Sequence, residues 1–428
     1  MLRPRPRWLP PPERRRRGDV VAAVAIAVAL AVTAVGLAVT APHSRTVSIP
    51  AAAPVPYPPG AEAVPAAFAE AWRAPSPDTS GPVVAGPVAV TGDGGTAAGR
   101  DAATGAVRWS YTRDLPLCTV AAGFPDRDGG VALALYRDGD WCSQLTSLRS
   151  DTGARDRQRN PDVRPGTRLV ATGSLVVATG SRYLEAFRSD LVRTVEYGDV
   201  PTPRQVGHQP RPDCAATGVA GTATRLAVLQ RCPGEAAARL TVLDPDGDEA
   251  DKPEELFSTP LPAAAPADPD ATLVAVSDDR VAVARAGPPR LEVFDRAGGV
   301  IATVGLDVPD GDLARPPAAG PEDVTAPVTA DGDQLYWWTG SRTIGLDAVD
   351  LTPLWTLPGT LGPGAVYAGR LLVPVPAGLA VVEGGTGAVR RTIPLARPEP
   401  PGPVVSAVLG DVLLEQRGPD LVALRPSP

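Results

Sequence analysis

Residues 101–109 read Asp-Ala-Ala-Thr-Gly-Ala-Val-Arg-Trp, a turn that leads into an extended segment. Asp, Thr and Gly favour tight turns, and the Val and Trp that follow favour a β-strand. The same turn recurs as Asp-Thr-Gly-Ala at 151–154 and as Gly-Thr-Gly-Ala-Val-Arg at 385–390. From Thr104 to Thr386 the mean period is about 47 residues, which is typical of β-propeller blades. Weaker copies of the turn lie at residues 187–190, 243–247, 294–298 and 346–355.

Short apolar runs on either side of these turns divide the chain into eight units. One four-stranded sheet cannot cover both of its faces, so such units must stack radially into a closed ring. The last unit, 404–425, has only three strands, and we expect residues 68–74 to supply its missing outer strand, because Trp72 resembles Trp109 and Trp355. The sequence therefore predicts an all-β, eight-bladed propeller, with seven blades as the alternative. The units are 83–113, 118–160, 167–198, 214–258, 271–305, 324–357, 364–394 and 404–425.

The composition agrees with a β-rich protein and leaves little material for catalysis. The 428 residues include 44 Gly and 51 Pro, more turn and breaker residues than an all-α protein tolerates. There are only two histidines, four cysteines and a single lysine, Lys252. General bases, soft metal ligands and amine nucleophiles are thus scarce, and the sequence predicts a protein that is not an enzyme.

A membrane anchor is predicted at the N-terminus. Residues 1–19 hold seven arginines, whereas residues 20–41 hold no charged residue and are long enough to span a bilayer. The positive-inside rule then places residues 1–19 in the cytoplasm and the rest of the chain outside, on a single-pass signal anchor in the cell membrane. A cleaved signal peptide is the alternative, although Pro42 directly after Ala41 disfavours cleavage.

A proline-rich linker is expected between the anchor and the propeller. Residues 42–66 contain seven prolines and no periodic pattern. Such a segment favours polyproline II, and about 25 residues at roughly 3.1 Å each could hold the next domain up to ~75 Å from the membrane. The propeller domain is then assigned to residues 67–428.

The cysteines test both topology and compartment. Cys118 and Cys142 open the first and third strands of the second unit, so that both lie at the same end of that blade. Cys214 and Cys232 flank the first two strands of the fourth unit and also lie at one end. Two disulfides, 118–142 and 214–232, are therefore predicted, and disulfides persist in an oxidising compartment outside the cytoplasm. A zinc site built from all four cysteines is the alternative.

The Asp-x-x-Thr-Gly-x-x-x-Trp unit at 101–109, with its echoes at 151 and 386, resembles the repeat of the PQQ-like, or quinoprotein alcohol dehydrogenase-like, propeller family. The Arg-rich tail, single anchor, Pro-rich linker and degenerate propeller resemble membrane-anchored envelope propellers of high-G+C Gram-positive bacteria. The resemblance implies that redox members hold a quinone over a tryptophan floor, with a disulfide of adjacent cysteines and a calcium ion. This chain has no adjacent cysteine pair, so PQQ is not expected as a cofactor.

Few other residues suggest chemistry. Asp244, Asp246, Asp248 and Glu255 stand at positions 1, 3, 5 and 12 of a calcium-loop count, but Glu249 replaces the glycine that the sharp turn needs. Calcium is therefore a weak candidate, and a solvated acidic hairpin is the alternative. His208 lies in a polar, Pro-rich connection without a nucleophile beside it, and of the neighbouring tryptophans 337 and 338 we expect one in the core and one partly exposed.

These observations favour a binding protein. We predict a non-catalytic scaffold or assembly factor of the cell envelope that binds another protein or a peptide. The alternatives are a sensor for a small molecule or glycan in the central channel and a quinone-dependent dehydrogenase. The net charge is −7 despite the arginines of residues 1–19, so the outer domain is acidic. No nucleic acid is therefore expected as a partner. The lipid bilayer would be contacted through residues 20–41.

Overall fold

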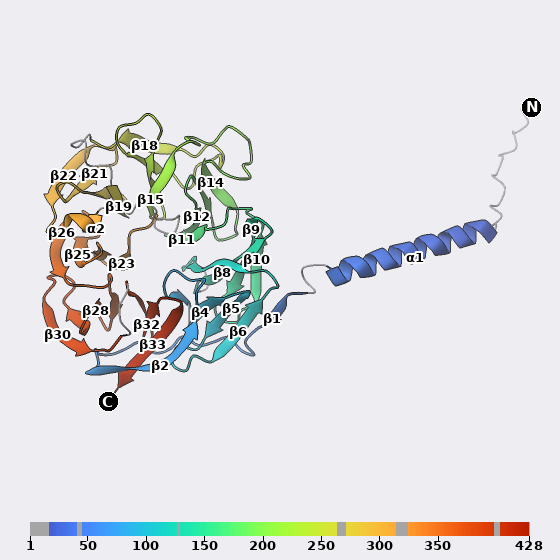
Figure 1. The fold of residues 1–428 in the computed structure, drawn as a ribbon, viewed down its shortest axis with the longest axis horizontal. Helices are drawn as coiled ribbons and strands as arrows, with labels where there is room; N and C mark the ends of the chain where they lie inside the picture. Colours follow the sequence, from blue (N-terminus) through green and yellow to red (C-terminus); the bar gives the residue numbers. More distant parts are fainter. Residues whose placement is uncertain are drawn as a thin grey trace, which may run out of the picture. The chain divides into compact units, whose positions relative to one another are not determined.

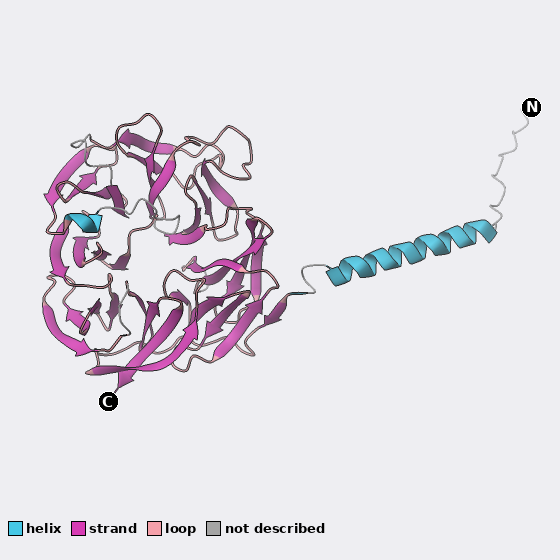
Figure 2. Ribbon diagram, viewed as in Figure 1, coloured by secondary structure: helices cyan, strands magenta, loops and turns pink. Residues whose placement is uncertain are grey.

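A computed structural model describes residues 17–40, 45–125, 129–262, 271–313, 324–397 and 403–427. The chain forms two compact units, Met1–Thr46 and Val47–Pro428. The second unit is built from strands, and its only helix among the described residues is the single turn α2 (Asp310–Leu313) (Figure 2).

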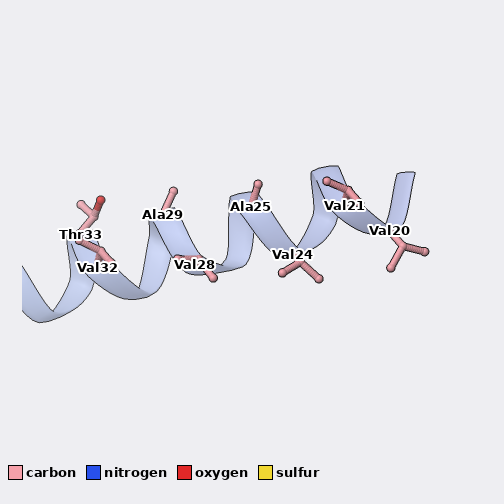
Figure 3. Close-up of a pocket in the computed structure, with 8 residues that line it drawn as sticks. All are labelled: Val20, Val21, Val24, Ala25, Val28, Ala29, Val32 and Thr33. Carbon is pink, nitrogen blue, oxygen red and sulfur yellow. The ribbon is translucent and has the colours of Figure 1, made fainter. Parts of the chain in front are cut away.

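The first unit contains one long helix, α1 (Arg17–Thr40). Its stretch Arg17–Leu37 has a mean hydropathy of 2.7, and the side chains along this stretch are exposed. Figure 3 shows the valine and alanine side chains that project from it, with Thr33 as the polar side chain among those labelled. The helix is long and apolar enough to cross a membrane.

The second unit is a ring of eight four-stranded antiparallel sheets, or blades, numbered here in chain order (Figure 1). Strands such as β11, β15, β19 and β23 lie toward the centre, whereas β22, β26 and β30 lie at the rim (Figure 1). The first strand of a blade is therefore its inner strand and the last is its outer strand. Each blade coincides with one predicted unit, so the prediction of eight blades rather than seven is confirmed.

Blades 1 and 2 contain β3 (Val83–Ala85), β4 (Val88–Asp93), β5 (Thr96–Arg100), β6 (Val107–Thr112), β7 (Leu117–Gly123), β8 (Val131–Asp138), β9 (Trp141–Arg149) and β10 (Arg155–Arg159). Blades 3 and 4 contain β11 (Arg168–Thr172), β12 (Leu175–Thr179), β13 (Tyr183–Phe187), β14 (Arg193–Gly198), β15 (Ala215–Gly221), β16 (Leu226–Arg231), β17 (Arg239–Leu243) and β18 (Glu255–Pro260). Blades 5 and 6 contain β19 (Ala271–Val276), β20 (Val281–Arg285), β21 (Arg290–Phe294), β22 (Val300–Gly305), β23 (Val328–Asp331), β24 (Gln334–Trp338), β25 (Arg342–Asp347) and β26 (Pro353–Pro358). Blade 7 contains β27 (Ala365–Tyr367), β28 (Arg370–Val375), β29 (Gly378–Val382) and β30 (Val389–Pro394).

Blade 8 joins the two ends of the ring. Its strands β31 (Val405–Leu409), β32 (Val412–Arg417) and β33 (Asp420–Ser427) come from the end of the chain, and its outer strand is β2 (Ala67–Pro75). β2 runs antiparallel to β33, with Ala67 opposite Ser427 and Pro75 opposite Asp420. The predicted closure by residues 68–74 is confirmed.

The repeated turn joins neighbouring blades at three places in the ring. Trp109 on β6 donates from Nε1 to the carbonyl of Ser150 at 2.9 Å. Gly153, in the turn that follows, has a φ of +70°, and a Cβ there would lie 2.4 Å from Cγ of Trp109. Glycine is thus required at position 153 for two reasons, the positive φ and the close approach of the Trp109 indole. The equivalent contacts join Trp72 to Ala102 and Gly105, and Trp355 to Gly384 and Gly387.

The apolar core lies between the blades. Trp337 on β24 is fully buried against blade 5 residues, whereas Trp338 is half-buried and donates from Nε1 to the carbonyl of Thr360 at 3.2 Å. The expectation of one core and one partly exposed tryptophan is confirmed.

Residues 47–66 do not form the free spacer that the sequence predicts. β1 (Val47–Ile49) adds a fifth strand to blade 1, with Val47 opposite Thr112 on β6. Val55 is buried, and its N–H donates to the carbonyl of Asp151 at 3.0 Å. Arg391 holds the end of the segment through the carbonyl of Pro65 at 2.7 Å. The segment has little regular structure, as its many prolines favour. Several of its apolar side chains nevertheless pack against the propeller, including Ala51, Val55 and Val64.

Candidate functional site

Two long loops on one side of the ring contain His208, Cys214 and three of the calcium candidates. The first, 199–214, connects β14 to β15, and the second, 244–254, connects β17 to β18; we call them together the lobe. The lobe covers the outer edge of β14, because Glu196 N–H donates to the carbonyl of Ala250 at 2.7 Å and Gly198 N–H donates to that of Pro210 at 3.2 Å. Edges of sheets bind other strands readily, and this edge is occupied.

A buried carboxylate organises the first loop. Glu196 on β14 is fully buried and pairs with Arg193. Its oxygens also accept the backbone N–H of Arg204, each at 3.0 Å, and the side-chain amide of Gln209 at 2.8 Å. A buried carboxylate is tolerated only when it is paired and hydrogen-bonded, so these partners hold residues 204–209 in one conformation.

Two ion pairs link the first loop to the second and to β18. Arg211 forms a bidentate pair with Glu255, with one nitrogen–oxygen distance of 3.0 Å, and also donates to the hydroxyl of Tyr197 at 3.1 Å. The carboxylate of Glu255 raises the pKa of Arg211, which stays charged. His208 Nδ1 lies 2.9 Å from an oxygen of Asp251, and burial, which would raise the pKa of Asp251, is outweighed by hydrogen bonds that lower it.

Both predicted disulfides are present. Cys214 and Cys232 close the end of the first loop with a Cα–Cα distance of 4.2 Å. Cys118 and Cys142 join the first and third strands of blade 2 at 6.2 Å. The lobe is therefore fixed at its base by one covalent link as well as by the ion pairs.

The tip of the first loop points into solvent. Residues 204–207 are all exposed, and Val206 has an exposed fraction of 85%. Val206 is therefore an exposed apolar side chain on a loop whose base is held in one arrangement.

The calcium candidates do not converge. Asp246 donates its N–H to the carboxylate of Asp244 at 2.9 Å, which forms a turn, and Asp246 and Asp248 are exposed. Glu255 faces Arg211 instead. Among the described residues no group of three His, Cys, Asp or Glu side chains is placed to hold a metal ion. The calcium loop stays a sequence prediction without geometric support.

Two adjoining pockets open beside the lobe, over the turns of blades 4 and 5. They have volumes of about 310 and 330 Å³ and share Arg296. Their walls carry both charges, and Arg296 pairs with Asp279 while Arg280 pairs with Asp350 at 2.9 Å. The first is lined by Thr224, Arg225, Asp244, Leu256, Asp278 and Arg296, and the second by Asp279, Arg280, Asp295, Arg296, Ala297 and Ile301.

Sequence reasoning missed the buried charges behind the lobe. Glu185 on β13 is fully buried, 3.1 Å from Arg193, and neither of its oxygens has a hydrogen-bond partner in the described residues. Burial raises its pKa to about 7, against the opposing effect of Arg193. The signal was a glutamate in the middle of the apolar run Tyr183–Phe187, although the sequence does not show which arginine would meet it.

The inner strand of blade 4 is hydrogen-bonded to a residue that precedes blade 6. Val219 on β15 donates its N–H to the carbonyl of Val324 at 2.6 Å, and Val324 is buried. Val324, which precedes blade 6, therefore lies beside the inner strand of blade 4.

The comparisons with known proteins give this chain no family. No family model matches the chain, and no curated protein matches it either. Among solved structures, BamB from Moraxella catarrhalis is similar, with 15% identity over 85% of this chain and 98% of that chain and a TM-score of 0.46. The Pan2 WD40 domain of Neurospora crassa has 12% identity over 73% and 90%, with a TM-score of 0.40. A chain of the mitotic checkpoint complex has 11% identity over 86% and 96%, with a TM-score of 0.45. The resemblance to the PQQ-like repeat stays a prediction, and the chain itself is an eight-bladed β-propeller.

Proposed function

We propose that this chain is a membrane-anchored propeller that binds another protein on the outer side of the membrane and does not act as an enzyme. The lobe is the observation that carries the proposal. A loop longer than about 12–15 residues without strands or helices of its own is uncommon in a compact domain and is usually functional. Here residues 199–214 form such a loop.

The fixed base of the lobe supports protein binding rather than a flexible linker role. Glu196, Arg211, His208 and the 214–232 disulfide all hold the loop in place. The exposed tip around Val206 has thus lost much of its conformational freedom before any partner arrives. Binding through a preordered loop avoids most of the entropic penalty of ordering it.

The anchor and the compartment are supported by independent features. α1 has the length and hydropathy of a membrane span, and seven arginines precede or begin it. Positive residues favour the cytoplasmic side. The two disulfides agree with an oxidising environment for the propeller.

Site-specific photocrosslinking tests the binding function. A photoreactive benzoylphenylalanine replaces Val206 in the full chain, in intact cells, and Val389, with an exposed fraction of 45% on the outer strand of blade 7, is the matched control position. We expect a discrete protein adduct from position 206 that is absent from position 389. The adduct should weaken when Cys214→Ser and Cys232→Ser release the loop. The same products at both positions, or none at 206, would contradict the proposal.

A reporter fusion tests the orientation. Alkaline phosphatase fused after Pro428 should be active, because the enzyme folds only outside the cytoplasm and the arginines hold the N-terminus inside. Replacing Arg14 to Arg17 by Glu should reduce that activity. An inactive, stably produced fusion would overturn the topology.

A further inference from the structure

The outer strand of blade 5 is an open, uncharged edge. β22 reads Val-Ile-Ala-Thr-Val-Gly over Val300–Gly305 and lies at the rim of the ring (Figure 1). Among the residues that the structure describes, it pairs with β21 alone, on one side. Ile301 has an exposed fraction of 48%, and Val300 and Thr303 are exposed as well.

Proteins normally protect such edges with charges, prolines or a covering segment. Of the eight outer strands that the structure describes, the other seven all carry such protection. β6 is covered by β1, and the edge of β14 is covered by the lobe. β10 has three arginines, β18, β26 and β30 each include proline, and β2 includes both charges and proline. β22 has none of these features.

The molecule itself shows that a blade rim accepts a further strand. On blade 1, β1 pairs antiparallel with β6, with Val47 opposite Thr112 and Ile49 opposite Ser110. All three residues of β1, Val47 to Ile49, are exposed, so the added strand is held mainly by its backbone. β22 offers the same kind of edge at the same radial position in blade 5.

A pocket lies beside the start of this edge. The cavity of about 330 Å³ is lined by Ile301 and Ala297 together with Asp279, Arg280, Asp295 and Arg296. Both arginines already pair with carboxylates, Asp350 and Asp279, and Asp295 accepts the backbone N–H groups of Ala297 and Gly299. The strand carries no charge, and the charged groups of the pocket wall already have partners, so the edge and the pocket together favour an uncharged segment with an apolar side chain beside Ile301.

We propose that the free edge of β22 binds an extended, uncharged segment of another protein by strand addition, with an apolar side chain of that segment in the pocket beside Ile301. Backbone hydrogen bonds would supply the affinity, and the pocket would supply the preference for an apolar side chain. This inference extends the proposed protein-binding function to a second surface, separate from the lobe.

The experiment uses the purified full chain in nanodiscs and a synthetic probe. The probe is a fluorescent peptide in which valine and threonine alternate between flanking lysines, and binding is followed by fluorescence anisotropy. Hydrogen exchange, read by mass spectrometry, reports protection of residues 300–305. The variant is Ile301→Lys, and Val389→Lys on β30 is the matched control, since the two side chains are similarly exposed.

We expect saturable binding, slower exchange over 300–305, and affinity at least about tenfold weaker for Ile301→Lys, because a lysine protects an edge strand. Val389→Lys should bind like the unchanged chain. A peptide of the same sequence with methylated backbone nitrogens should not bind, because it cannot donate hydrogen bonds. Binding that survives methylation or the Ile301→Lys change would overturn strand addition at β22. A dimer of the full chain that dissociates on Ile301→Lys would also overturn the proposal, since the occupant would then be a second copy. Either failure leaves the crosslinking test at Val206 unaffected.

Discussion

Glu185 is a buried carboxyl group whose pKa lies well above its ordinary value. Its carboxyl group is fully buried on β13 and has the guanidinium of Arg193 at 3.1 Å without a good hydrogen bond. Burial raises its pKa from 4.5 to about 7. The folded chain therefore binds a proton at this site between those pH values, whereas the unfolded chain releases it.

Replacing Glu185 by Gln should change how stability depends on pH. Since the folded-state pKa is raised, the free energy of unfolding that this group contributes falls as pH rises from 4.5 to about 7 and is constant above. Glu185→Gln should therefore gain stability relative to the unchanged chain by about 1–3 kcal/mol between pH 5 and pH 8. Urea unfolding at both pH values gives the comparison, with Glu254→Gln, at an exposed position, as the control. A difference that does not vary with pH would refute the raised pKa.

Residue chemistry was predictable where it is local. Each Thr-Gly turn packs against a tryptophan from the preceding blade, and both belong to the repeated sequence. The sequence alone therefore indicated that Trp72, Trp109 and Trp355 are equivalent. The pairing of Glu196 with Arg204 and Gln209 was not predictable, because it depends on how a long loop folds back over a strand edge.

The turn between blades gives a test at the scale of elements. Gly153 and Gly139 both have a positive φ, +70° and +61°, but only Gly153 faces a side chain, the ring of Trp109. Gly139→Ala should lose about 1 kcal/mol through its backbone conformation alone. Gly153→Ala should lose clearly more, because Trp109 must move and its hydrogen bond to Ser150 is strained.

Thermal unfolding of the two alanine variants measures the difference directly. Tryptophan fluorescence adds a local readout, since displacement of Trp109 should alter the emission of Gly153→Ala only. Equal losses of stability would mean that the packing of the tryptophan on the turn contributes little to the joint between blades.

The disulfides give a second test at this scale. Removing the 214–232 link by Cys→Ser at both positions should accelerate hydrogen exchange over residues 199–214 and reduce stability by about 3 kcal/mol in the chain-entropy account. Removing the 118–142 link should reduce stability similarly but leave exchange in the lobe unchanged. If exchange over 199–214 is the same in both variants, the ion pairs alone fix the loop.

For the whole molecule, the number of blades and the closure of the ring followed from the sequence because both arise from a regular period. The packing of residues 47–66 against the propeller could not be predicted from the sequence. A proline-rich segment is extended whether it is solvated or packed against a blade, so composition cannot distinguish the two. Val55, buried beside the turn at Asp151, shows that a few apolar side chains within the segment decide the outcome.

Ring closure gives the final prediction, since the contact between β2 and β33 is the seam that the covalent chain does not cross. Phe68 is buried there and stacks edge-on against Tyr367 at 5.4 Å, and Trp72 donates to the carbonyl of Ala102 at 2.7 Å. Truncation of a buried Phe alone reduces stability by about 3–5 kcal/mol. Removal of β2 would also expose the edge of β33.

Three soluble forms, beginning at residues 45, 61 and 75, separate this seam from the docked segment. Starting at 61 removes β1 and Val55, which lie on a ring that is already closed, so the unfolding midpoint should fall modestly. Starting at 75 removes nearly all of β2 and opens blade 8, so the midpoint should fall far more, or the domain should fail to fold. Phe68→Ala in the form starting at 45 is the milder change, and its unfolding midpoint should lie between those of the forms starting at 61 and 75. Equal midpoints for the forms starting at 61 and 75 would mean that seven complete blades are stable without the seam, because the ring would then not depend on a strand taken from the other end of the domain.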